Sequence, residues 1–173
     1  MPRSDHHVLD ARTLLIRLCE AEVAFVIVGG MAAVAQGSAY ITVDLDIAYH
    51  RTPVNLQRLT DALAPLKPQL RGAPAGLPFV LDAPTLKAGL NFTLLTDAGD
   101  IDLLGEVSGL GFYEQVKDWA EEVEVFGRRC WVLTIEGLIQ SKQAAGRGKD
   151  LRLIPELKAL QALRDQTETN QSD

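Results

Sequence analysis

A short apolar segment that ends in two glycines is the feature that most constrains the fold of this chain. Residues 24–28 are rich in Val, Ile and Phe and stop at Gly29 and Gly30, which is typical of a buried strand that ends in a tight turn. The small side chains of residues 31–37 then favour a helix that ends at Gly37. Such a helix directs its first amide groups, and the positive end of its dipole, back toward the end of the strand.

A pair of aspartates follows on the next expected strand, residues 44–49. Because side chains alternate along a strand, Asp44 and Asp46 share one face while Leu45 and Ile47 enter the core. Two carboxylates on one face can bind a hard divalent cation. Each half of the pattern is common by itself, since Asp-x-Asp also occurs on plainly solvated strands. Together the two halves predict a site for a nucleotide and magnesium.

A second pair of aspartates lies on an expected hairpin formed by residues 90–95 and 100–104, with Gly99 in the turn. Asp100 and Asp102 share one face of the second strand. We choose Asp102 as the third carboxylate of the site, because the apolar residues after it anchor the strand. Asp100 lies nearer the turn and is the competing candidate.

The other expected elements surround these strands. The order of elements predicts an α/β (α+β) fold in which a mixed sheet is flanked by helices, with further helices at the C-terminus. Residues 67–87 are irregular and are interpreted either as a binding loop or as a plain connection. The remaining expected elements are helices at 8–21, 55–66, 135–145 and 150–163, and a hairpin of 123–126 with 130–133 around a turn at 127–129.

The composition is that of one globular domain. The chain has 173 residues, of which 47% are hydrophobic and 23% charged, so we expect a single domain over 1–164 and a polar, disordered tail over 165–173. The net charge of −6 disfavours strong nonspecific binding to nucleic acid, which needs a cationic surface. Neither a signal peptide nor a membrane-spanning stretch is evident, so a cytoplasmic location and no membrane partner are expected.

The cysteines and histidines do not indicate a zinc site or a disulfide framework. Cys19 and Cys130 do not form a CxxC pair and are expected to be reduced, structural thiols. His6 and His7 lie at the terminus and His50 stands alone, so their spacing does not fit zinc.

Three carboxylates near a nucleotide suit the transfer of a nucleoside monophosphate. In that reaction a hydroxyl attacks the α-phosphorus of a nucleoside triphosphate, and pyrophosphate leaves. Carboxylates on rigid strands are suitable ligands for two Mg²⁺ ions, for which Mn²⁺ can substitute. Asp44, Asp46 and Asp102 are the candidate metal ligands and catalytic residues.

A cation on a helix beside the sheet can hold the pyrophosphate. Lys142 lies among small residues in the body of an expected helix, an unusual place for a lysine that serves only solubility. Arg147 and Lys149 are sufficiently explained by the end of that helix, where cations complement the dipole. The candidate basic contacts to an RNA acceptor, most of them ordinary surface charges, are Arg51, Arg58, Lys67, Arg71, Lys87, Arg147 and Lys149.

At these residues the chain resembles the nucleotidyltransferase superfamily with the polymerase β-like fold. The signature of that superfamily is an apolar residue, Gly-Gly or Gly-Ser, a spacer, and Asp-x-Asp between apolar positions. The chain meets it with Val28-Gly29-Gly30, a spacer at the upper limit of length, and Asp44 and Asp46. Within the superfamily the chain is most similar to small bacterial AbiEii-like and related uncharacterised proteins. The shared motifs are Thr-x-Asp-x-Asp at 42–46, Gly-x-Ile-Asp-Leu-Leu at 99–104, and Lys-x-x-Ala-x-Arg-x-Lys-Asp at 142–150.

The resemblance implies a magnesium-dependent nucleotidyltransferase that uses a nucleoside triphosphate. It implies an acceptor hydroxyl on RNA or tRNA, protein or a small molecule, and in some members a toxin's role in a toxin–antitoxin system with a cognate partner protein. The alternative is a nucleotide-sensing or antitoxin-like binding subunit without chemistry. Two positions depart from the pattern: Tyr40 replaces a common arginine and Leu153 a common aspartate. The implied nucleotide-binding residues are Gly29, Gly30, Thr42 and Lys142.

Overall fold

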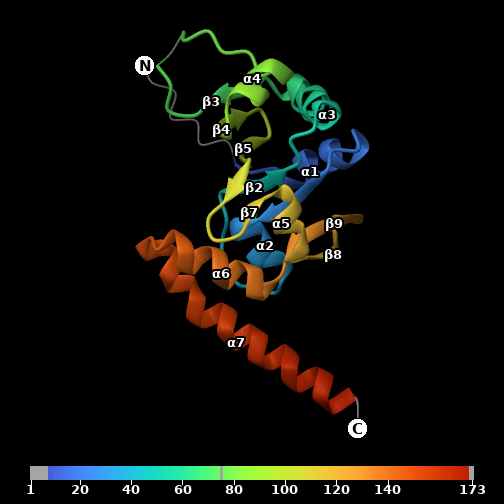
Figure 1. The fold of residues 1–173 in the computed structure, drawn as a ribbon, viewed down its shortest axis with the longest axis vertical. Coiled ribbons are helices and arrows are strands. Elements are labelled where there is room, and N and C mark those ends of the chain that lie inside the picture. The colour runs from blue at the N-terminus through green and yellow to red at the C-terminus, as the bar shows by residue number, and fades with distance from the viewer. Residues whose placement is uncertain (1–7, 75, 172–173) are drawn as a thin grey trace.

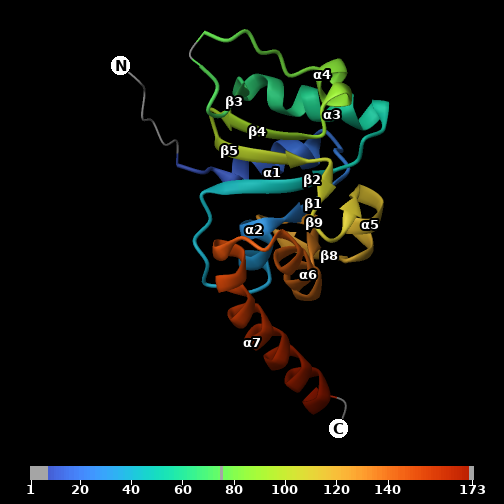
Figure 2. The same cartoon turned by 60° about the vertical axis from the view of Figure 1, so that its left-hand side comes forward.

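A mixed seven-stranded sheet forms the centre of the computed structural model, which describes residues 8–74 and 76–171. Its strand order is β3-β4-β5-β2-β1-β9-β8, and helices flank it (Figures 1 and 2). The strands are β1 (Phe25–Val28), β2 (Asp44–Tyr49), β3 (Gln69–Leu70), β4 (Asn91–Thr96), β5 (Gly99–Leu104), β8 (Ala120–Val125) and β9 (Arg128–Leu133). A separate two-stranded ribbon consists of β6 (Glu106–Val107) and β7 (Gly111–Phe112).

The helices occupy the connections between the strands. They are α1 (Ala11–Glu20), α2 (Gly29–Ala35), α3 (Pro53–Leu63), α4 (Ala83–Ala88), α5 (Tyr113–Asp118), α6 (Ile135–Ala145) and α7 (Gly148–Gln171), with a 3-10 turn at Ala64–Leu66. The expected fold class is confirmed, and each expected helix and strand is present. The bounds of β2 and α6 are those expected, and the ends of the other elements are shifted. The short elements β3, α4, β6, β7 and α5 were not expected, because two-residue strands and six-residue helices have too little periodicity to be recognised.

The central strands alternate as expected between a core face and a site face. Leu45 and Ile47 of β2 are fully buried, whereas Asp44 and Asp46 retain partial exposure on the opposite face. The strand β2 runs antiparallel to β1 and parallel to β5. The core also takes the apolar face of α1, whose Leu14, Leu15 and Leu18 are fully buried. The two sides of β2 therefore separate apolar packing from the candidate chemistry.

The helix α2 starts earlier than expected. It begins at Gly29 itself and ends at Ala35, so no separate turn precedes it. Gly29 has φ +62°, a value that glycine adopts without the steric cost of a Cβ atom. The strand β1 therefore passes directly into α2 through one residue in the left-handed region.

The turn between β8 and β9 also differs from the expected one. It consists of Phe126 and Gly127, with φ +51° and +73°, and not of residues 127–129. Two central residues with positive φ match the twist of a two-residue hairpin. Arg128 and Arg129 are therefore part of the strand, opposite Val125 and Glu124.

Residues 165–171 belong to a long helix, where the sequence predicted a disordered tail over 165–173; residues 172 and 173 lie outside the described residues. Helix α7 continues to Gln171, and its C-terminal half extends away from the sheet in both views (Figures 1 and 2). The hydroxyls of Thr167 and Thr169 donate to the carbonyls of Leu163 and Asp165, four residues earlier. Polar composition predicted solvent exposure correctly here, but a solvated segment can still be helical.

The two cysteines lie side by side without a disulfide. The Sγ atoms of Cys19 and Cys130 are 3.8 Å apart, and both residues are free thiols. Among the described residues, the structure contains no helix with the length and apolarity to cross a lipid bilayer.

Candidate metal and nucleotide site

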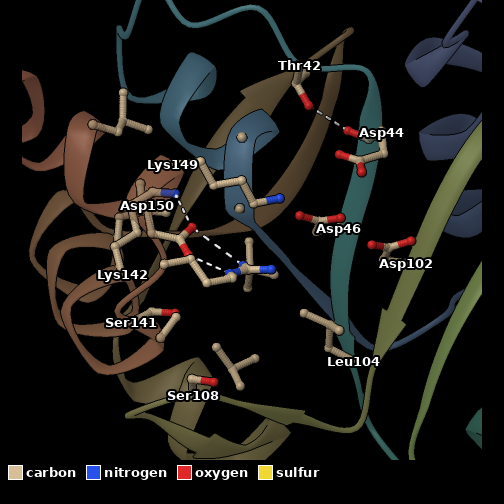
Figure 3. A pocket seen from close by; sticks show the side chains of 18 of the residues that line it. Thr42, Asp44, Asp46, Asp102, Leu104, Ser108, Ser141, Lys142, Lys149 and Asp150 are labelled. Atoms are coloured by element: carbon tan, nitrogen blue, oxygen red, sulfur yellow. Dashed lines mark hydrogen bonds and ion pairs between the residues drawn. The ribbon is translucent and has the colours of Figure 1, made fainter.

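The register between β2 and β5 brings together the aspartates that the sequence singled out. Asp44 pairs with Asp100, and Asp46 with Asp102, across two parallel strands. Asp44, Asp46 and Asp102 each offer a carboxylate oxygen within 4.8 Å of the others, and they point toward a common space (Figure 3). This geometry favours Asp102 over Asp100 as the third carboxylate. The three carboxylates can hold a metal ion.

The two glycines give this cluster its room. A Cβ atom on Gly29 would collide with Oδ2 of Asp46, so only glycine lets that carboxylate lie against the start of α2. A Cβ atom on Gly30 would lie 2.8 Å from the ring of Tyr40 and 2.9 Å from Oγ1 of Thr42. The absence of side chains on Gly29 and Gly30 therefore leaves room for the side chains of Asp46, Tyr40 and Thr42 as well as for a ligand.

Asp46 is the carboxylate whose environment most requires a cation. Its Oδ1 atom is the one buried polar side-chain atom, among the residues that the structure describes, that has no hydrogen-bond partner. Burial, and then the charges of Asp44 and Asp102, raise the pKa of Asp46 to about 7. An unpartnered buried carboxylate oxygen is costly unless it is protonated or binds a cation. An all-oxygen donor set of this kind fits Mg²⁺ or Mn²⁺.

The raised pKa of Asp46 predicts that metal-free protein loses stability as the pH rises. The carboxyl of Asp46 has a pKa near 3.9 in the unfolded chain and about 7 in the folded protein. Its contribution to the free energy of unfolding is therefore fully present below pH 4 and is lost as the pH rises through 7. Asp46→Asn removes this loss. We expect the gain in unfolding free energy of Asp46→Asn over wild type to be about 2 kcal/mol larger at pH 8 than at pH 5. Urea denaturation in EDTA measures it, and a gain independent of pH would contradict it.

Asp100 is engaged elsewhere. Nη1 of Arg71 lies 2.8 Å from Oδ2 of Asp100, and Nη2 of the same guanidinium lies 2.5 Å from Oδ1 of Asp102. Burial raises the pKa of Asp102, and the charge of Arg71 opposes that rise. The sequence suggested Arg71 only as one of seven contacts to RNA. Its contacts with the aspartates could not be predicted from the sequence, because 29 residues separate Arg71 from Asp100 and the pairing of the edge strands brings them together.

Cations face the acidic cluster across a cavity of about 470 Å³. Lys142 of α6 and Lys149 at the start of α7 line the opposite wall, and Lys149 points toward the carboxylates (Figure 3). Nζ of Lys142 lies 3.6 Å from Oδ1 of Asp150, which is buried and also accepts a hydrogen bond of 2.6 Å from Nε of Arg147. The structure thus brings Lys142, Arg147 and Lys149 to one wall, although the sequence ranked the latter two lower.

Thr42 borders the cavity, but its hydroxyl is already used. Its Oγ1 donates to the carbonyl of Asp44 at 2.8 Å, which shapes the entry into β2 (Figure 3). The lining also includes four uncharged polar residues that the sequence did not suggest as ligands: Tyr40, Asn91, Ser108 and Ser141. Tyr40 was noted in the sequence only because it departs from the family pattern. Asn91 lies in β4 and Ser141 in α6, whereas Tyr40 and Ser108 lie in connections. Single polar residues scattered over four segments have no common spacing that would identify them in sequence.

Several of the basic residues suggested as RNA contacts instead support the fold. Arg51 donates to the hydroxyl of Tyr49 and to two carbonyls at the end of α4. Arg58 donates to the carbonyl of Glu22, and Lys67 forms an exposed ion pair with Asp97. Of the seven suggested residues, Arg147 and Lys149 line the cavity.

Comparison with known proteins supports the architecture. No family model matches the chain, and no curated protein sequence matches it. A crystal structure of a candidate nucleotidyltransferase from Thermotoga maritima is similar to it, with a TM-score of 0.52 and 16% sequence identity. The similarity covers 96% of this chain and 99% of the other. It does not distinguish an AbiEii-like protein from other relatives, but it shows that the chain has a nucleotidyltransferase-like fold.

Proposed function

We propose that this protein is a magnesium-dependent nucleotidyltransferase. The observation that carries the proposal is the cluster of Asp44, Asp46 and Asp102 beside the start of α2, facing Lys142 and Lys149 across one cavity. A triphosphate with bound divalent cations requires this separation of charge, because its metals need anionic ligands and its remaining oxygens need cations. The fold shared with the Thermotoga protein supports the same activity.

The chain's own residues would bind and orient the reactants. Asp44, Asp46 and Asp102 would hold Mg²⁺, which when bound neutralises phosphate charge and lowers the pKa of an attacking hydroxyl. The oxygen of the acceptor hydroxyl would form a new ester bond to the α-phosphorus while its proton passes to the carboxylate of Asp102, and the bond to the pyrophosphate oxygen would break, so that pyrophosphate leaves with the electron pair. Gly29 and Gly30 border the cavity and leave space for the phosphates beside α2. The products are a nucleotidylated acceptor and pyrophosphate.

Lys142 and Lys149 would contact the phosphates that leave. Lys142 has a side chain only 13% exposed, and Asp150 keeps its ammonium group at the cavity wall. An ammonium group held in this way loses less conformational freedom on binding than an exposed lysine does. Arg147 continues to neutralise Asp150 when Lys142 contacts a phosphate.

Further details of the proposal follow from the resemblance of the sequence. We include two Mg²⁺ ions, with Mn²⁺ as a substitute, and a cytoplasmic location. The acceptor is a hydroxyl of RNA or tRNA, protein or a small molecule. A role as the toxin of a toxin–antitoxin system, with a cognate partner protein, completes the proposal.

Lys142→Gln is expected to weaken binding of a nucleoside triphosphate about tenfold while metal binding in the absence of nucleotide is unchanged. The reason is that one charge-assisted contact to phosphate is lost, worth about 1.4 kcal/mol. Lys158→Gln is the matched control, since this lysine is exposed on α7 and does not line the cavity. Isothermal titration calorimetry at constant ionic strength measures both affinities. Equal losses in the two variants would contradict a phosphate contact by Lys142.

The activity itself is tested by following a label. Purified protein is incubated with Mg²⁺, each of the four α-³²P-labelled nucleoside triphosphates, and total RNA, total protein or small-molecule extract. We expect one or more nucleotides to label one acceptor class in wild type and none in Asp46→Asn. Label that enters no acceptor class, together with nucleotide binding by wild type, would instead favour a binding subunit without chemistry.

A further inference from the structure

We propose that Arg71 is the resident cation of the acidic cluster, and that it releases Asp102, while staying on Asp100, when a divalent cation binds. This inference rests on the proposed metal site and assigns a role in its regulation to two residues outside the triad. Arg71 and Asp100 are then positioning residues, which control when the third carboxylate becomes available.

The geometry gives Arg71 two separable contacts. One guanidinium nitrogen contacts Asp100 at 2.8 Å and the other contacts Asp102 at 2.5 Å. Because the two carboxylates lie two residues apart on one strand face, the guanidinium can lose one contact and keep the other. The backbone of Arg71 stays in place, since its N–H donates to the carbonyl of Thr93 at 2.9 Å. Release therefore requires only movement of a side chain.

The carboxylates of the triad differ in their availability. Oδ1 of Asp46 has no hydrogen-bond partner, whereas Oδ1 of Asp102 accepts a charge-assisted bond from Arg71. Lone pairs that face a guanidinium are not available to a metal ion on the same side. A divalent cation approaching Asp102 would also be repelled by the arginine at short range. The metal-free protein thus presents Asp46 ready to bind and Asp102 already occupied.

Asp100 makes the release reversible. With Asp100 present, Arg71 keeps a partner after it leaves Asp102, so no partly buried guanidinium is left without an anion. With an uncharged residue at position 100, Arg71 would have Asp102 as its remaining carboxylate partner and would hold it more strongly. Asp100 therefore assists metal binding without being a ligand.

The test measures Mn²⁺ binding without nucleotide by electron paramagnetic resonance at fixed pH and ionic strength. Arg71→Gln is expected to bind Mn²⁺ about tenfold more tightly than wild type, because one charge-assisted competitor is removed. The matched control is Lys67→Gln, which removes one positive charge from the same segment at an exposed ion pair with Asp97. It is expected to change the affinity by less than about twofold, because exposed charges are screened.

A second variant, Asp100→Asn, tests the role of Asp100 in the same Mn²⁺-binding measurement. We expect it to weaken Mn²⁺ binding several-fold in wild type and by a smaller factor in the Arg71→Gln background, since its effect acts partly through Arg71. Unchanged or weaker binding by Arg71→Gln, with a circular dichroism spectrum like that of wild type, would overturn the inference and show that Arg71 orients Asp102 for the metal. Equal effects of Asp100→Asn in the two backgrounds would overturn the role of Asp100. Failure of wild type to bind Mn²⁺ would instead overturn the proposed metal site itself.

Discussion

Asp46→Asn is expected to abolish nucleotidyl transfer, with a loss of at least about 1,000-fold, and to eliminate measurable binding of Mg²⁺ or Mn²⁺. Asp46 lies close to both Asp44 and Asp102 and contributes the buried oxygen that has no hydrogen-bond partner. An amide at this position keeps the shape of the side chain and removes the charge that a metal requires. Single-turnover transfer of label and metal titration measure the two losses.

The same substitution is expected to stabilise the metal-free protein above pH 7. Three carboxylates within 4.8 Å repel one another, and Asp46 has its pKa raised to about 7 by burial and by this repulsion. If Asp46→Asn is more stable but inactive, the carboxylate of Asp46 serves function and does not stabilise the fold. Asp97→Asn is the control, because this aspartate is exposed in the β4–β5 turn and pairs with Lys67. Transfer by Asp46→Asn at the rate of the control would contradict the assignment of Asp46.

Gly29→Ala is expected to lose metal binding and transfer to nearly the same extent, although it changes no charged group. Gly29 has φ +62°, and a Cβ atom there would collide with Oδ2 of Asp46. The carboxylate would have to leave the cluster, because the backbone at the start of α2 is held by the buried strand before it. We expect a cost of about 2–3 kcal/mol in unfolding free energy, of which about 1 kcal/mol is backbone strain.

Gly127→Ala is a matched control for that strain. Gly127 has φ +73° in the β8–β9 turn, and a Cβ atom there would meet nothing within 4 Å. It should lose about 1 kcal/mol of stability and keep both metal binding and transfer. Chemical denaturation and metal titration of both variants compare the two positions. Retention of metal binding by Gly29→Ala would show that the contact between Gly29 and Asp46 does not position the carboxylate.

The acidic cluster could be predicted from sequence because its determinants are local. The alternation of Asp44 and Asp46 with buried Leu45 and Ile47 is visible within a few residues, and the structure confirms it. The choice between Asp100 and Asp102 could not be derived in the same way, since both share one face of β5. It depends on the register with β2, which places Asp102 beside Asp46.

The contacts around the cluster depend on long-range placement and were missed for that reason. Arg71 reaches Asp100 and Asp102 only because β3 pairs with β4 at the edge of the sheet. A two-residue strand carries no periodic signal. The buried Asp150, which receives both Lys142 and Arg147, looked in sequence like the polar start of a helix. Ion pairs between separate elements require the tertiary fold, whereas strand alternation does not.

The most direct test of the central claim is the binding of nonhydrolysable nucleoside triphosphates to the intact chain. Isothermal titration calorimetry with α,β-methylene analogues of all four nucleotides, in Mg²⁺ and in EDTA, compares wild type with Asp46→Asn. We predict that wild type binds at least one analogue in Mg²⁺ and none in EDTA, and that Asp46→Asn binds none in either. Binding that is equally tight in EDTA, or no binding of any of the four in Mg²⁺, would contradict the assignment of this cavity as a metal-dependent nucleotide site.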